Sequence, residues 1–269
     1  MSQTYQATGI NLKSLPFGET DRLVTVLTAE FGLLRAVAPG ARKPKSRLRG
    51  RIEPFVINQL LVVRGRSLDR IIQAETQHSY PGLSKDLAKL TIAQYWAEIA
   101  LSLGLSDQPQ IELYAALNAS LVTLERQPHQ SPEAAARLLA CLNSGVLQLL
   151  AVGGLTPQLQ ACCRSGQPLT PVIDNPDWRV GFSIEAGGLV DLAVLAATGS
   201  RMRPTATLTA GELITLRQLT DLEHLTGDRP PLPLVTGRKF EHLLRHYAQH
   251  HLGKAIRSAA LVDTLFIDS

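Results

Sequence analysis

Short apolar runs separated by turn-forming residues dominate the N-terminal part of the chain. The runs "RLVTVLT" (22–28) and "LLRAVAPG" (33–40) flank the turn "EFG" and predict a β-hairpin. A second hairpin is predicted by "PFVINQLLVV" (54–63) and "LDRIIQAETQ" (68–77) around the turn "RGRS". With the opening segment 5–15 the pattern predicts five strands and leaves little room for a helix. We expect a small closed barrel, because closure removes the unpaired edges of an open sheet.

Helical periodicity replaces this pattern after the barrel. Apolar residues recur every three or four positions between 85 and 105, which predicts an amphipathic helix. The segments 110–126 and 131–154 repeat the pattern, so we expect a helical bundle. Tyr95 and Trp96 share this spacing and are interpreted as core residues rather than as a stacking surface.

The last third of the sequence mixes irregular and helical segments. Residues 155–200 are rich in Pro, Gly and Asp and predict loops with one short strand around "VGFSIEAGG" (180–188). Helical patterning returns at 209–222 and 237–254, and these helices are expected to complete the bundle.

Positive charge is concentrated in one short segment of this 269-residue chain. Residues 1–80 hold twelve Lys and Arg against six acids, a net +6, whereas the whole chain is only +4. Six of these cations fall within ten positions, with no acid before Glu53: Arg42, Lys43, Lys45, Arg47, Arg49 and Arg51. A cationic segment can simply be a solvated face or a mobile loop. Its density here favours a polyanion, because each neutralised phosphate releases counterions. We therefore expect a flexible cationic loop that follows a nucleic-acid backbone.

Aromatic residues near the predicted turns suggest base stacking. Phe17, Phe31 and Phe55 flank the turns or the basic loop and are suited to stack on bases. Two of them fit equally well as core residues that plug the barrel, and the sequence leaves both readings open.

No pattern typical of catalysis or of a bound metal is found. The chain lacks a phosphate-binding GxxxxGK[ST] loop, a GxGxxG, a GxSxG and paired carboxylates in an apolar context, so we expect no enzyme, no catalytic residue and no cofactor. Four histidines follow helical spacing among basic residues and are interpreted as a surface helix: His242, His246, His250 and His251. The segment "CCRSG" (162–166) looks like half a zinc knuckle, but no second CxxC pair exists.

The remaining composition predicts a cytoplasmic protein. No segment offers eighteen uninterrupted apolar residues, and the N-terminus lacks the pattern of a signal peptide. Three cysteines imply no disulfide framework and suit a reducing compartment.

At residues 18–55 the sequence "GETDRLVTVLTAEFGLLRAVAPGARKPKSRLRGRIEPF" resembles the N-terminal domain of the RecO family of bacterial DNA repair and recombination mediators. The shared features are an acidic pair before a strand, a T-x-E-x-G turn, a G-A-R-K-x-K-S loop and a P-F pair. They correspond here to Glu19 and Asp21, to Thr28, Glu30 and Gly32, to residues 40–46, and to Pro54 and Phe55. The later segments "LTPQLQACCRSGQ" (155–167) and "VGFSIEAGGLV" (180–190) also match the family's plan.

The resemblance implies a multidomain α+β fold. Its parts would be an oligonucleotide/oligosaccharide-binding (OB) barrel at 1–80, a helical bundle at 81–155, a small degenerate zinc-finger-like module at 156–200 and C-terminal helices at 201–269. Many members hold zinc with four cysteines, and the matching positions here are Cys162, Ser165, Val190 and Ala193. One ligand of four remains, so we expect no metal, and we expect Trp178, Phe182 and Ile184 to hold the module together instead.

The resemblance also implies a function in the RecFOR pathway. Such a mediator binds single- and double-stranded DNA, anneals complementary strands, and works with RecR and the single-strand binding protein (SSB) to load the RecA recombinase. We expect these residues to contact DNA: Arg35, Arg42, Lys43, Lys45, Arg47, Arg49, Arg51, Arg64 and Arg66. The basic helix with Arg238, Lys239 and Arg245 is the candidate surface for the SSB tail. A membrane and a small-molecule substrate are not expected, and the expected location is cytoplasmic and nucleoid-associated. An RNA-annealing chaperone and a non-catalytic protein scaffold remain alternatives.

Overall fold

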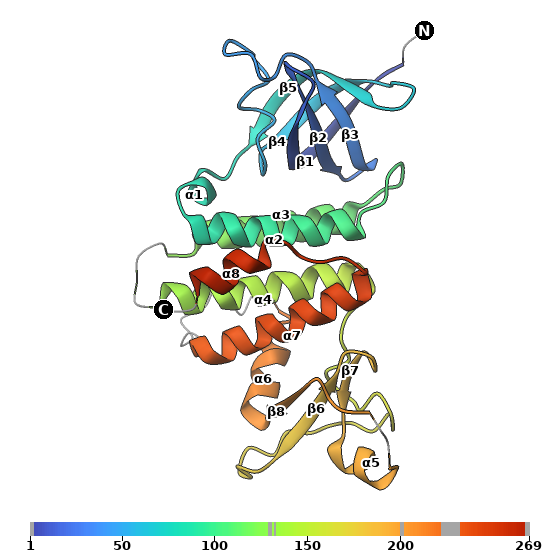
Figure 1. Cartoon of the computed structure of the whole chain (residues 1–269), viewed down its shortest axis with the longest axis vertical. Helices are drawn as coiled ribbons and strands as arrows, with labels where there is room; N and C mark the ends of the chain where they lie inside the picture. The colour runs from blue at the N-terminus through green and yellow to red at the C-terminus, as the bar shows by residue number, and fades with distance from the viewer. Residues whose placement is uncertain (1–2, 129–130, 132, 200–201, 222–231, 267–269) are drawn as a thin grey trace. The chain divides into compact units, whose positions relative to one another are not determined.

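The computed structural model describes residues 3–128, 131, 133–199, 202–221 and 232–266 (Figure 1). The chain forms two compact units. The first comprises Met1–Gln127 and the returning segment Arg257–Thr264, and the second comprises Pro128–Ile256 and Leu265–Ser269. The four-part division expected from the sequence stays a prediction.

A closed five-stranded barrel forms the N-terminal part of the first unit (Figure 1). Its strands are β1 (Thr4–Phe17), β2 (Asp21–Thr28), β3 (Gly32–Ala38), β4 (Ile57–Val63) and β5 (Asp69–His78). The strand order is β1-β2-β3-β5-β4, and β1 is long enough to pair with both β2 and β4. A short parallel pairing of β3 with β5 closes the barrel. The expected strands, the barrel and its OB-like form are therefore confirmed.

The barrel interior is filled by small and branched side chains from alternating strand positions. The buried cluster consists of Val24, Val26, Leu34, Ala36, Ala38, Ala41, Ile52, Leu60, Val62, Ile71 and Ala74. Two members, Ala41 and Ile52, come from the segment between β3 and β4 rather than from a strand. This segment therefore contributes to the core as well as connecting two strands.

Helices follow the barrel in the same unit. They are α1 (Pro81–Ser84), α2 (Leu87–Leu103) and α3 (Ile111–Arg126), and α8 (Ala259–Leu265) returns from the end of the chain. The predicted helices at 85–105 and 110–126 are confirmed, whereas α1 and α8 were not predicted.

Side-chain hydrogen bonds stabilise the start of α2 and the end of α3. Asp86 caps α2 by accepting from the backbone N–H groups of Ala88 and Lys89, at 2.8 and 3.2 Å. The buried Lys89 ammonium donates to the carbonyl oxygens of Glu125 and Gln127, at 3.0 and 2.6 Å, at the C-terminus of α3. A cation at a helix C-terminus is stabilising because it satisfies carbonyls that lack helical partners.

The second unit is built on the packing of α4 (Ala134–Val152) against α7 (Leu234–Leu252). Gly237 of α7 lies so close to α4 that an added Cβ would be 3.2 Å from the Cβ of Leu139. The side-chain amide nitrogen of the buried Asn143 donates to the carbonyl of Gly237 at 2.9 Å, which gives that donor a partner at this contact.

Helix α4 is also apolar and long enough to cross a membrane. Most of it is buried inside the second unit, however, as in the core helix of a soluble protein. Length and composition alone are therefore weak evidence for a membrane span.

A three-stranded sheet of order β7-β6-β8 forms where the sequence predicted one short strand. Its strands are β6 (Arg179–Ser183), β7 (Gly188–Val190) and β8 (Ala206–Thr209), and α5 (Leu192–Ala197) follows β7. Helix α6 (Ala210–Gln218) begins at a capping box formed by Thr209 and Glu212. It is shorter than the predicted 209–222, and position 222 lies outside the described residues.

The donor set of the zinc-finger-like module does not fit a tetrahedral zinc site. Cys162 and Ser165 are present, but Val190 and Ala193 offer no ligand atom at the other two positions. Burial would raise the pKa of the Cys162 thiol, but hydrogen bonds from the Ser165 hydroxyl and the Asp191 N–H outweigh burial and lower it. That N–H lies 3.3 Å from the sulfur. Phe182 is fully buried and packs edge-on against Tyr247 with ring centroids 5.8 Å apart, whereas Trp178 and Ile184 are half-buried.

Replacing Ile52 by Ala should lower the free energy of unfolding of the first unit by about 3 kcal/mol, because the substitution leaves a cavity in the barrel core. The matched control is Ile72→Ala on β5, whose side chain is 52% exposed and should change stability by less than about 0.5 kcal/mol. In a Trp178→Phe background, urea unfolding followed by the fluorescence of Trp96 reports the first unit alone. Equal effects of the two substitutions would contradict the placement of Ile52.

Candidate nucleic-acid interface

The basic loop, residues 39–56, connects β3 to β4 and is anchored at its first end to the β1–β2 turn. The backbone N–H of Arg42 donates to the carbonyl of Thr20 at 2.8 Å, and its guanidinium donates to the carbonyl of Gly18 at 2.9 Å. The N–H of Gly40 donates to the carboxylate of Asp21 at 2.8 Å. This bond, together with one from the Thr20 hydroxyl, lowers the pKa of Asp21.

Two buried asparagines hold the other end of the basic loop. The Asn11 amide donates to the carbonyls of Arg51 and Glu53, at 2.8 and 3.0 Å, and the Asn58 amide donates to the carbonyl of Arg51 at 2.6 Å. The Arg51 guanidinium donates to the carbonyl of Ala74 on β5. Backbone and side chain of Arg51 therefore both tie the loop to the barrel.

The middle of the basic loop is a chain of tight turns. Backbone bonds link residues three apart, from Lys43 to Gly40, from Ser46 to Lys43 and from Arg51 to Leu48. Leu48 packs against the barrel core and Ile52 is fully buried. Apolar side chains within the charge run therefore anchor the loop backbone to the core, and the expectation of a flexible segment stays a prediction.

The charged side chains of the basic loop remain accessible, although Arg42 and Arg51 also donate to backbone carbonyls of Gly18 and Ala74. All six are on exposed residues: Arg42, Lys43, Lys45, Arg47, Arg49 and Arg51. Within the described part of the chain, none of the six forms an ion pair with a carboxylate. The nearby Glu53 pairs instead with Arg22 of β2, at 3.6 Å. The loop therefore presents a dense positive charge on a fixed backbone, an arrangement that suits a phosphate backbone.

The other three predicted cations, Arg35, Arg64 and Arg66, line a separate groove of about 650 Å³. We call it the aromatic groove; its walls are the β2–β3 turn with β3, the β4–β5 turn and the α2–α3 connection, and Phe31 lies in it. Arg35 and Arg66 are exposed, and Arg64 lies 3.4 Å from Asp107.

The barrel separates the aromatic groove from the basic loop. β4 begins at Ile57, directly after the basic loop, and ends at Val63, directly before Arg64. Seven residues at about 3.3 Å each place the two features about 20 Å apart along the strand. The nine cations expected to contact DNA therefore form two groups, six on the basic loop and three in the aromatic groove.

The three candidate stacking residues have different environments. Phe55 is buried in the barrel with a positive φ of 65°, and is thus a core residue. Phe17 is 42% exposed at the end of β1, and Phe31 is half-buried in the aromatic groove. Phe31 packs against Tyr5 with ring centroids 5.1 Å apart. Tyr5 was missed from the sequence because its proximity to Phe31, 26 positions away in the chain, arises only in the folded barrel.

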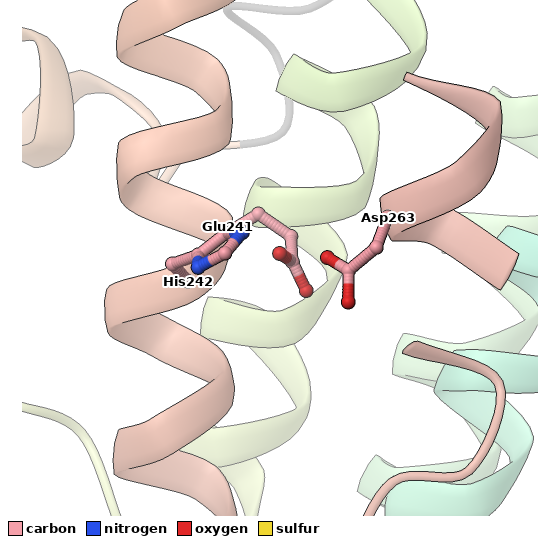
Figure 2. Close-up of side chains that lie close together, drawn as sticks. All are labelled: Glu241, His242 and Asp263. Atoms are coloured by element: carbon pink, nitrogen blue, oxygen red, sulfur yellow. The ribbon is translucent and has the colours of Figure 1, made fainter. Parts of the chain in front are cut away.

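The histidines of α7 form no closed ligand set within the second unit. Figure 2 shows Glu241 and His242 as neighbours on α7. The Glu241 carboxylate accepts from the guanidinium of Arg245, one turn later, with the Nε bond at 2.8 Å. Among the described residues of the second unit, no three His, Cys, Asp or Glu side chains converge on one point.

Comparison with known proteins gives one consistent family. The family described as "Recombination protein O N terminal" matches residues 1–80, and "Recombination protein O C terminal" matches residues 84–260. The DNA repair protein RecO of Acaryochloris marina is 48% identical over 99% of this chain and 96% of its own length. That of Gloeothece citriformis is 48% identical over 98% of both chains, and that of Synechocystis sp. is 42% identical over 99% of this chain and 98% of its own. The two domain matches follow one another along the chain that forms the barrel and the helices described above, and the chain belongs to the RecO family of DNA repair proteins.

Proposed function

We propose that this protein is a recombination mediator that binds single- and double-stranded DNA through the phosphate backbone and anneals complementary strands. It would also help to load RecA on SSB-coated DNA. The observation that carries the proposal is the basic loop, whose six cations are exposed and unpaired by carboxylates in the described structure. The names of its relatives support a role in DNA repair.

Annealing matches the chemistry that the basic loop offers. Base pairing supplies the free energy, so the reaction needs no nucleotide, cofactor or catalytic residue. The protein has to screen the repulsion between two phosphate backbones while leaving the bases free to search for register. A row of long, exposed cationic side chains on an anchored backbone meets both requirements, because it contacts phosphates without reading base edges.

A groove in the second unit is our candidate for the SSB tail, which is acidic and hydrophobic. It has a volume of about 420 Å³ and is lined by Val235, Arg238, His242 and His246 of α7 and by Ala206 of β8. Val235 is 81% exposed, so the groove joins an accessible apolar surface to basic side chains. Such a mixture suits a peptide of this composition.

Two of the three cations of α7 that were expected to bind the SSB tail are engaged in ion pairs. The Lys239 ammonium lies 2.7 Å from both carboxylate oxygens of Glu212, and Arg245 is bonded to Glu241. Arg238 and Lys239 both line the groove, and Arg238 is the cation chosen for a test because its substitution leaves the Lys239–Glu212 pair intact. A surface for RecR is part of the same proposal, but no residue is assigned to it. A cytoplasmic, nucleoid-associated location agrees with these partners.

Two other functions are kept for comparison. An RNA-annealing chaperone would use the same backbone contacts, since phosphates do not distinguish ribose from deoxyribose. A non-catalytic scaffold would dock the basic loop on an acidic protein and would leave oligonucleotides unbound. Family membership favours DNA over both.

Binding of single-stranded DNA should depend steeply on salt. If about six phosphates are neutralised, log affinity should fall against log salt concentration with a slope of about −4. Replacing Arg42, Lys43, Lys45 and Arg47 by Ala should reduce the slope to about −1.5, because four counterion-releasing contacts are lost. The slope is measured by fluorescence anisotropy of labelled single-stranded DNA between about 50 and about 200 mM salt.

The control for this variant removes four exposed cations elsewhere, at Lys85, Arg164, Arg203 and Lys254, and so makes the same change in net charge. Its slope should stay near −4. A loop variant with the wild-type slope, or a control variant with the same loss, refutes the assignment of the basic loop.

The protein should speed the annealing of complementary fluorescent DNA strands without added nucleotide. With the loop variant that carries all four Ala substitutions, the strands should anneal at close to the spontaneous rate. The charge-matched control variant should speed annealing as the wild type does. Parallel reactions with RNA strands distinguish the alternatives: faster annealing of RNA than of DNA indicates the RNA chaperone, and no effect on either indicates the scaffold.

A peptide with the sequence character of the SSB tail, acidic and ending in apolar residues, should bind the second unit's groove. Arg238→Glu should weaken binding by at least about tenfold, through loss of attraction and gain of like-charge repulsion. The control is Arg203→Glu, an exposed cation that does not line this groove. Titration by isothermal calorimetry measures both, and equal affinities for the two variants would place the tail elsewhere.

A further inference from the structure

We propose that the aromatic groove is a base-stacking site for an unpaired nucleotide, with Phe31 as the stacking side chain. The inference rests on the proposed function and deepens it, because it separates a site that requires single strands from the basic loop, which contacts any phosphate backbone.

The position of Phe31 is fixed before any ligand arrives. Its backbone N–H donates to the Thr28 hydroxyl at 3.0 Å, and that hydroxyl donates to the carbonyl of Gly32 at 2.9 Å. Two residues later, the N–H of Leu33 donates to the carbonyl of Leu105 at 2.8 Å. Gly32 has a φ of +66°, and an added Cβ would lie 2.0 Å from the same Leu105 oxygen, so the turn depends on glycine.

The Phe31 ring is supported on its inner side by Tyr5. The two ring centroids are 5.1 Å apart, and the Tyr5 hydroxyl donates to the carboxylate of Asp69. Burial, followed by this bond, raises the pKa of Tyr5, so the hydroxyl stays protonated as a donor. The guanidinium of Arg64 lies 5.7 Å from the Tyr5 ring centroid. Little freedom remains for Phe31 to lose when a base stacks on it, which favours binding.

The charges around the groove suit the phosphates that flank such a base. Arg35 and Arg66 are exposed and form no ion pair within the described residues. The groove also holds two acids. Asp69 is occupied by Tyr5 and by the N–H of Gly65 at 3.0 Å, and Asp107 faces Arg64 at 3.4 Å. The net charge of the lining is positive, and an aromatic wall beside cations is the arrangement that binds single strands.

The basic loop lacks an equivalent platform. Its own aromatic residue, Phe55, is 3% exposed and belongs to the barrel core. Phe17 lies near the loop and is 42% exposed, and it is therefore the matched control for Phe31. The two sites then differ in kind: the loop neutralises phosphates of single strands and duplexes alike, whereas the groove binds only where a base is unpaired.

The test compares an oligothymidylate of about 16 nucleotides with an abasic oligonucleotide of equal length and charge. The wild type should bind the thymidylate about tenfold more tightly, because only thymidylate has bases to stack. Phe31→Leu should lower the affinity for thymidylate almost to that for the abasic strand and leave abasic binding unchanged. Phe17→Leu should retain the wild-type preference. Anisotropy measures affinity, and quenching of 2-aminopurine fluorescence reports stacking directly.

A second variant guards against a folding defect of Phe31→Leu. Ser106→Leu places a bulky side chain that cannot stack at an exposed position of the groove and should likewise abolish the preference for thymidylate. Thymidylate binding by Phe31→Leu and Ser106→Leu at the wild-type level overturns the inference, as does equal binding of both strands by the wild type. In either case, binding that still depends on the basic loop leaves the proposed function standing. If neither strand binds at low salt, the proposed function itself fails.

Discussion

The burial of Ile52 and Leu48 against the barrel core is the interaction on which the rest of this protein's candidate chemistry depends. A run of six like charges would repel itself and remain disordered if it had no other side chains. Here the apolar residues between the charges bury themselves, and Asn11 satisfies the carbonyl of Arg51 behind them. The backbone is therefore fixed while the cationic side chains remain in water. The six cations can therefore be both closely spaced and accessible, because the apolar residues between them hold the loop on the barrel core.

The barrel has a second consequence, which is the separation of two kinds of ligand contact. Its strands place the basic loop and the aromatic groove at opposite ends of β4, about 20 Å apart. Under the proposed function, phosphate contacts at one end would carry no information about base pairing, whereas stacking on the aromatic ring at the other end would require an unpaired base. A protein that anneals strands would benefit from this division, because a duplex product would lose the stacking contact and keep only the contacts to phosphate.

In the second unit, hydrophobic burial holds the zinc-finger-like module together and ion pairs neutralise part of an apparently basic helix. In that module Phe182 is fully buried, and the N–H of Asp191 donates to the Cys162 sulfur. On α7, Lys239 and Arg245 are matched by Glu212 and Glu241. A partly buried pair of this kind is structural, because separating it leaves a charge without its partner. The surface charge of α7 is thus lower than its sequence suggests.

The sequence by itself determined the five barrel strands, the long helices α2, α3, α4 and α7, and the position of the basic loop, because hydrophobic periodicity and charge runs are local properties. It also determined the family, through motifs within residues 18–55. Only the tertiary structure decided that the nine predicted cations form two groups, that Phe55 is core while Phe31 meets Tyr5, and that the loop is anchored. Short elements such as β8 and α8 were likewise found only there. These features depend on contacts between residues far apart in the chain, and such contacts arise from barrel closure and side-chain burial, which no local pattern records.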